Sequence, residues 1–179
     1  MFQRILLNGL VAGLVVGIPL FAITVALQGH PESPWGVALG YLIMLVALAT
    51  VFVAVKRQRD LALGGVIGFW PAFGMGLGIS AVASVLYVLA WEATLAWTHM
   101  DFAGDYARAM IDRQRARGAS PQALARLAAD MDSFRAHYAQ PAYRMAETFS
   151  EIFPVGLLVS LVSAGLLRNS RFMPLRRAG

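Results

Sequence analysis

Four long segments of this chain carry almost no charge, and this pattern constrains the fold more than any other feature. Each is longer than 20 residues, and together they comprise 5–27, 35–55, 73–97 and 146–167. Only the last two contain charged side chains, all of them glutamates. The hydrocarbon core of a bilayer is about 30 Å thick, which about 20 residues of α-helix span at about 1.5 Å per residue. The sequence therefore predicts four transmembrane helices.

The composition agrees with lipid as the surrounding solvent. Apolar residues make up 58% of the chain and charged residues 14%, against about 45–50% and about 25% in soluble domains. So few polar side chains would leave a water-soluble fold of this length with too much apolar surface. We therefore expect an all-α membrane protein, in which a single membrane domain, 1–179, forms a bundle of four transmembrane helices.

The first apolar segment has a second interpretation as a signal peptide, because Met1–Arg4 resembles a basic leader start. The apolar run that follows is longer than the roughly 7–15 residues of a signal-peptide core, and no clear small-residue cleavage site follows it. We expect a retained span. Cleavage would leave three spans and reverse the side of the N-terminus.

The basic residues predict the orientation. They follow the second span in Lys56–Arg59 and the fourth span in the tail from Arg168 to Arg177, and Arg4 precedes the first span. With four spans these groups share one side, and short basic loops face the cytoplasm. We expect both termini in the cytoplasm and a bacterial inner membrane as the location, since outer-membrane proteins use β-barrels. This placement accounts for the net charge of +5 without nucleic acid.

The segment between the third and fourth spans, 99–144, predicts an external helical hairpin. Its first half has apolar residues at four-residue spacing and ends at Gly118, a typical helix stop. Ser120 and Pro121 then form a typical helix start. The two apolar stripes most simply pack on each other, and docking on a partner helix or on the lipid surface is the alternative.

A shorter apolar segment, Leu61–Ala72, precedes the third span. It is too short and too rich in glycine to cross a bilayer. We expect an interfacial or re-entrant segment there, whose backbone is covered by protein.

The candidate polar site consists of charged residues near the external ends of the third and fourth spans: Glu92, Glu147, Glu151 and Arg144. Glu92 and Glu151 lie at similar depth, and Glu147 lies one turn from Glu151 on the same side of its helix. Arg144 is spaced to pair with Glu147. A polar cap that closes the bundle is the simplest interpretation, and a proton relay is the alternative. The glutamates could form a metal site together with His30 or His99, but the spacing of these residues does not match a known pattern of metal ligands.

Small residues at four-residue spacing predict close helix packing. The predicted packing positions are Gly9, Gly13 and Gly17 in the first span and Gly74 and Gly78 in the third. A neighbouring row in the third span, Gly76, Ser80 and Ser84, is also small. Without bulky side chains, helix backbones approach closely and gain dispersion energy. The pattern does not separate packing within the chain from formation of a homo-oligomer.

Pro19 and Pro154 lie inside the first and fourth spans. Each removes one helix hydrogen bond and leaves a carbonyl four residues earlier without its usual donor. We expect a kink at each position.

Two stretches of the chain resemble a known family. The more distinctive motifs are GGVIGF at Gly64–Phe69 and TFSEIFPVG at Thr148–Gly156. They resemble the bacterial family called domain of unknown function 4199, over roughly Tyr41–Arg168. The resemblance implies a four-span bacterial membrane protein with an external helical insertion and without an established activity. Glu151 and Pro154 match the family pattern, which makes them of more interest than Glu92.

Function follows less directly from the sequence. It contains no catalytic signature, so we expect no catalytic residue, cofactor or metal. The first hypothesis is a non-enzymatic membrane protein that binds lipid or a partner protein, with a homodimer as its simplest assembly. One alternative is a proton-linked small transporter or channel that uses Glu151 with Glu92 or Glu147, with Ser160 and Ser163 as a short polar path below. Another is a lipid-modifying enzyme that uses the glutamates as acid and base.

Overall fold

The computed structural model describes residues 2–26 and 34–174. Within these residues the chain forms helices and turns and no strand. The helices are α1 (Phe2–Ala26), α2 (Pro34–Ala62), α3 (Phe69–Thr98), α4 (Phe102–Ala116), α5 (Pro121–Tyr138) and α6 (Pro141–Leu167). The predicted all-helical architecture is confirmed.

Three of these helices, α1, α3 and α6, are long and apolar enough to cross a membrane. They have 25, 30 and 27 residues, against the about 20 that a bilayer core requires. Helix α2 is the fourth long helix of the chain, with 29 residues. Pro19 and Pro154 lie inside α1 and α6 without ending either helix.

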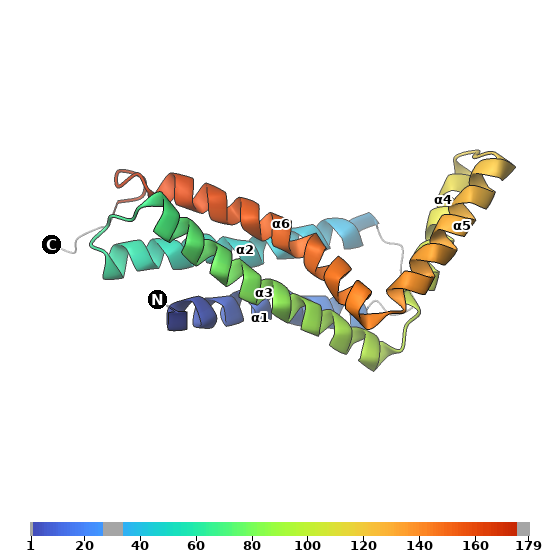
Figure 1. The fold of residues 1–179 in the computed structure, drawn as a ribbon, viewed down its shortest axis with the longest axis horizontal. Coiled ribbons are helices and arrows are strands. Elements are labelled where there is room, and N and C mark those ends of the chain that lie inside the picture. Colours follow the sequence, from blue (N-terminus) through green and yellow to red (C-terminus); the bar gives the residue numbers. More distant parts are fainter. Residues whose placement is uncertain (1, 27–33, 175–179) are drawn as a thin grey trace.

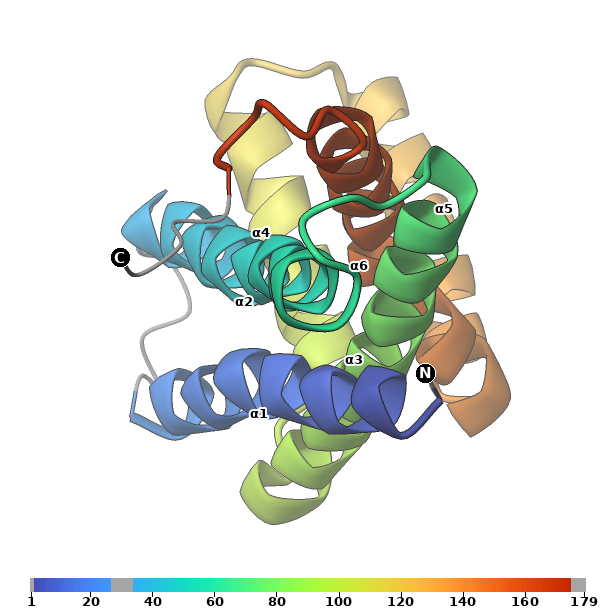
Figure 2. The ribbon, with the colours of Figure 1, turned by 90° about the vertical axis from the view of Figure 1, so that its left-hand side faces the viewer.

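Helices α1, α2, α3 and α6 lie alongside one another and form an elongated bundle (Figure 1). The view along the bundle shows the four helices grouped together (Figure 2), and α3 packs most extensively against α1 and α6. Helices α4 and α5 pack against each other and lean away from one end of the bundle. We refer to α4 and α5, Phe102–Tyr138, as the arm.

Helices α1 and α3 run parallel in a regular register set by glycine. A Cβ at Gly9 would lie 2.5 Å from the Cβ of Val82 in α3, and one at Gly17 would lie 3.0 Å from the Cβ of Ala90. Between them, Gly13 faces Leu86 even more closely. These positions admit no side chain without movement of α3, so glycine permits the close approach of the two helices.

Gly78 continues this register, because a Cβ there would lie 3.0 Å from a methyl of Ile5. At Gly74, nothing among the described residues lies within 4 Å of the place where its Cβ would be, so the packing role expected of this glycine has no described partner.

Helices α3 and α6 run antiparallel, again with small residues at the contact. A Cβ at Gly76 would lie 3.0 Å from the Oγ of Ser160. One turn further along α3, the Ser80 hydroxyl donates to the carbonyl of Gly156, at 3.2 Å. Ser80, Ser84 and Ser160 are fully buried, and each hydroxyl has a hydrogen-bond partner, which removes the cost of burying a polar group.

The expected separate segment over Leu61–Ala72 is not present as such. Helix α2 continues through Ala62 and α3 already begins at Phe69, so only a turn of six residues separates them. Gly64 and Gly65 occupy this turn with φ values of 64° and 94°, a region that residues with a side chain rarely adopt. The glycine-rich sequence therefore allows a tight helix–helix connection.

Candidate functional site

The centre of the candidate site is an ion pair between Glu92 of α3 and Arg144 of α6. The guanidinium donates to both carboxylate oxygens, with Nε to Oε1 at 2.7 Å and NH2 to Oε2 at 2.5 Å. Each side chain keeps less than a fifth of its surface exposed. This two-point geometry is the strongest arrangement that an arginine and a carboxylate form, and here it joins residues 52 positions apart.

Arg144 also contacts Tyr138, the last residue of α5. Its guanidinium carbon lies 5.8 Å from the centre of the Tyr138 ring, and NH1 approaches the Tyr138 carbonyl oxygen at 3.4 Å. The Tyr138 hydroxyl in turn accepts a hydrogen bond of 2.7 Å from Nε1 of Trp91. Burial raises the pKa of Tyr138 to about 12, so this phenol stays neutral at physiological pH.

A cluster of aromatic rings extends this contact into the arm. Trp91 meets Phe102 edge to face with ring centres 5.0 Å apart, and Phe102 lies 5.5 Å from Tyr138. Phe134 packs on Tyr138 at 5.3 Å and on Tyr106 at 5.7 Å. Because the rings come from α3, α4 and α5, they fix the base of the arm to the bundle.

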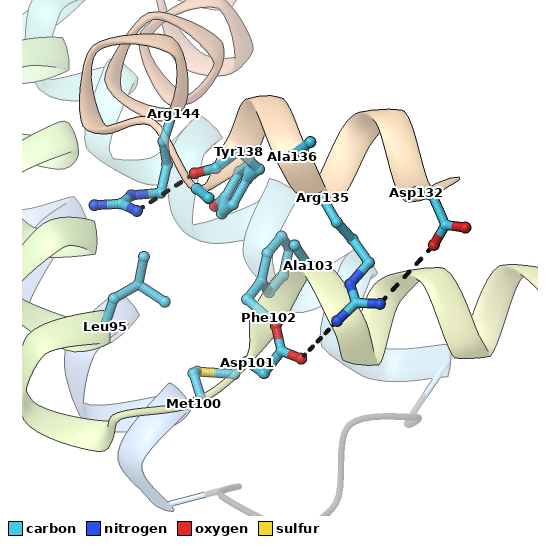
Figure 3. A pocket seen from close by; sticks show the side chains of 11 residues that line it. Leu95, Met100, Asp101, Phe102, Ala103, Asp132, Arg135, Ala136, Tyr138 and Arg144 are labelled. Carbon is cyan, nitrogen blue, oxygen red and sulfur yellow. Dashed lines mark hydrogen bonds and ion pairs between the residues drawn. The ribbon is translucent and has the colours of Figure 1, made fainter. Parts of the chain in front are cut away.

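A pocket of about 490 Å³ opens beside this cluster (Figure 3). It is lined by apolar and charged side chains from the end of α3, both arm helices and the start of α6, including Leu95, Met100, Phe102, Arg135, Tyr138 and Arg144. Figure 3 shows Arg135 between Asp101 and Asp132, with nitrogen–oxygen distances of 3.7 and 4.0 Å. These exposed pairs contribute little stability, so Arg135 is free to exchange its partners for a ligand.

The other two predicted glutamates lie elsewhere. Glu147 and Glu151 are both exposed on α6, and neither carboxylate hydrogen-bonds or forms an ion pair within the described part of the chain. Arg144 therefore pairs with Glu92 across the helix interface rather than with Glu147 on its own helix. The reason is geometric: Arg144 is directed toward α3, and Glu147 is directed outward.

Glu151 also lies away from the buried serines of α6. Nine residues separate it from Ser160, and at about 100° per residue the two positions are about 180° apart around the helix. Ser160 is fully buried against α3, whereas Glu151 is exposed. The serines therefore do not continue a polar path from Glu151.

His99 takes a backbone role at a helix end. His99 ends α3 in the left-handed conformation, with φ of 52°, and donates its backbone N–H to the Leu95 carbonyl. His30 lies outside the described residues. Across 2–26 and 34–174, no three histidine or acidic side chains gather in a way that could hold a metal ion.

Sequence reasoning missed a buried arginine at the other end of the bundle. Arg59 is fully buried, and it donates to the carbonyls of Phe172 and Met173, at 2.9 and 2.6 Å, and to Asp60 at 2.7 Å. Because Arg59 and Lys56 donate to it, the pKa of the Asp60 carboxyl falls below its usual value. The basic run predicted only the end of a span, and nothing in it distinguished Arg59 from Arg57, since the two acceptors are 113 and 114 residues away.

A family model described as "Protein of unknown function (DUF4199)" matches residues 7–169. No curated protein and no solved structure matches the chain.

Proposed function

This chain belongs to the DUF4199 family of proteins of unknown function, and we propose that it is a non-enzymatic integral membrane protein with four spans. In this proposal the bundle lies in a bacterial inner membrane, with both termini in the cytoplasm. The arm stands on the external side and binds a partner protein.

The register of α1 and α3 supports the fourth span. The two helices run parallel, with Gly9 against Val82 and Gly17 against Ala90. If both cross the membrane in the same direction, the chain must return between them, and α2 is the helix that connects them. Helix α6 runs antiparallel to α3, which brings the chain back to the side from which it began.

The two-point ion pair between Glu92 and Arg144 is the main observation that supports a binding role rather than an enzymatic one. Both oxygens of the carboxylate accept hydrogen bonds, and the Tyr138 hydroxyl accepts one from Trp91. A general acid or base needs a proton site free for its substrate. These groups instead hold the arm at a fixed angle to the bundle, which favours a rigid surface for recognition.

The arm itself has the character of a water-exposed surface. Its two helices carry exposed side chains of both charges, five arginines and three aspartates, and exposed pairs such as Arg115 with Asp112 lie along α4. Burial of these charges in lipid would be unfavourable. A surface of this kind suits a protein partner with mixed charge.

The proton-linked transporter is the second candidate, and Glu151 is the observation that favours it. A carboxylate without a partner on an apolar helix is a typical position for proton transfer. Against it, Glu151 lies on the side of α6 opposite Ser160, so this buried serine offers no next step for a proton from Glu151. The same unpaired carboxylate also fits a contact with a second membrane protein, including another copy of this chain.

The topology is testable with single cysteines, because the natural chain contains none. Cysteines placed at Gln3, Arg113 and Arg171 in intact cells would be labelled with a membrane-impermeant maleimide. The proposal expects labelling at Arg113 only, until the cells are opened. Labelling of Gln3 or Arg171 in intact cells would contradict it.

The binding role is testable with a photo-crosslinking residue in place of Arg113 on the arm and in place of Leu158 on the exposed side of α6. We expect one adduct of defined mass from the arm and lipid adducts from α6. An adduct of twice the mass of the chain would identify a homodimer as the assembly. No protein adduct from any exposed arm position would contradict the proposal.

A further inference from the structure

A second cavity is lined by residues from the start of α1, the last turns of α2 and Met75 of α3. The start of α1 and the end of α2 lie at the end of the bundle away from the arm (Figure 1). Its volume is about 210 Å³. Four polar side chains line it, Arg4, Asn8, Arg57 and Gln58. Ala54, Leu61 and Met75 supply an apolar wall. The cavity therefore combines cationic donors with a surface that suits hydrocarbon.

Among the described residues, neither arginine of this cavity has an acidic partner. Arg4 donates to the amide oxygen of Gln58, which positions its guanidinium at the cavity, and it forms no ion pair with another described residue. Arg57 is exposed and forms no hydrogen bond or ion pair within the described segments. Two positive charges thus line one small cavity, and no described acidic residue pairs with either of them.

The one carboxylate among the described residues at this end, Asp60, is already occupied. It accepts from Lys56 at 2.5 Å and from Arg59 at 2.7 Å. Two further basic residues, Arg168 and Arg171, follow α6 at the same end. The local field therefore favours an anion, and the uncompensated charges are at Arg4 and Arg57.

The available donors match a phosphate group. A guanidinium offers a planar fork of N–H groups that fits two phosphate oxygens, and its charge strengthens both hydrogen bonds. The side-chain amide of Gln58 leaves its N–H groups available, because only its oxygen is used by Arg4. The apolar wall next to these donors distinguishes the cavity from a site for a small free anion.

We propose that this cavity binds the phosphate of an anionic phospholipid, with Arg4 and Arg57 as its cationic contacts. The acyl chains then lie along the apolar faces of α1 and α2, where exposed side chains such as Leu7 and Val53 continue from the cavity. The inference goes beyond the proposed function, since it concerns the end of the bundle that lies away from the arm and needs no partner protein.

The test uses the full chain, purified in detergent, with dioleoyl phosphatidylglycerol and dioleoyl phosphatidylcholine as probes. Bound lipids are counted by native mass spectrometry. The test variant is Arg4→Gln with Arg57→Gln. The control is Arg113→Gln with Arg126→Gln, which removes the same charge from two exposed arm arginines that form no ion pair in the described residues.

We expect the natural chain to retain one phosphatidylglycerol in preference to phosphatidylcholine. Each arginine exchanged in the cavity should weaken this binding about tenfold, the effect of losing one charge-assisted hydrogen bond. The arm control should bind as the natural chain does. Unchanged binding by the cavity variant, or an equal loss in the control, would overturn the proposal.

A second measurement separates lipid from free anion. Inorganic phosphate at millimolar concentration should not displace phosphatidylglycerol from the natural chain. If inorganic phosphate displaces the phosphatidylglycerol, and this competition is lost in the Arg4 and Arg57 variant, the cavity binds free phosphate rather than a phospholipid. That result would overturn the proposal. Because both arginines are on the surface of the bundle, the thermal unfolding of the cavity variant should match that of the natural chain. Crosslinking of the arm measures partner binding independently of lipid binding at the cavity. Either proposal can therefore fail while the other is still tested.

Discussion

Glu92 and Arg144 form the last pair of the antiparallel register between α3 and α6. The register begins with Gly76 against Ser160 and continues with Ser80 against Gly156. Every step of four residues forward in α3 matches a step of four residues back in α6, and the same steps bring Glu92 to Arg144. The ion pair at the base of the arm is therefore aligned by the close packing of small residues at the opposite end of the helices.

Loss of the Glu92 carboxylate should loosen the arm. Glu92→Gln leaves the guanidinium of Arg144 largely buried without its counter-charge, and we expect the free energy of unfolding in detergent to fall by about 2 kcal/mol. Thermal unfolding and limited proteolysis of the α5–α6 junction would measure it. Glu147→Gln, which changes an exposed and unpaired carboxylate, is the matched control. Equal stability of the two variants would show that the ion pair between Glu92 and Arg144 does not stabilise the fold.

Close packing of α1 on α3 should not tolerate a side chain at Gly13. Gly13→Ala brings a methyl group against Leu86, and we expect a loss of about 1–3 kcal/mol through overpacking. Gly74→Ala is the control, because no described residue lies within 4 Å of its Cβ position and alanine favours the helix by up to about 1 kcal/mol. Chemical unfolding of both variants would measure the difference. A Gly13 variant as stable as the Gly74 variant would contradict the register.

The Asp60 carboxylate should stabilise the end of the bundle opposite the arm in a pH-dependent way. The pKa of Asp60 is lowered in the folded chain by its hydrogen bond with Arg59. Its contribution is then fully present above the unfolded pKa of about 4 and is lost as the pH falls through the folded pKa. Asp60→Asn should be less stable than the natural chain at pH 7 by about 2 kcal/mol, and this gap should close below pH of about 4. A gap that stays constant down to the lowest accessible pH would argue against the ionised pair.

The Tyr138 hydroxyl should connect the arm to α3 through Trp91. Tyr138→Phe keeps the ring in the aromatic cluster and removes only the acceptor for the indole N–H, so we expect a loss of about 1 kcal/mol. The emission of Trp91 should change as well, which a chain with the other three tryptophans replaced by phenylalanine would resolve. Tyr143→Phe, on the exposed side of α6, should leave both readouts unchanged.

The candidate site was only partly predictable. The sequence placed Glu92 and Arg144 near the same end of the bundle, because distances along a helix follow directly from residue counts. It suggested Glu147 as the partner of Arg144, since that spacing along one helix is the nearest local choice. The actual partner depends on how α6 is rotated against α3, and no local pattern encodes that rotation.

By itself the sequence determined the long apolar helices, because helix hydrogen bonds are local and the length of an uncharged run is read directly from the chain. It also determined where α5 starts, where Ser120 accepts a hydrogen bond from Ala123 N–H at 3.2 Å. Only the tertiary structure decided that Gly9, Gly13 and Gly17 contact α3 and that Arg59 is buried under Phe172 and Met173. Those outcomes depend on the register and rotation of helices distant in sequence, which are set by the packing of whole surfaces.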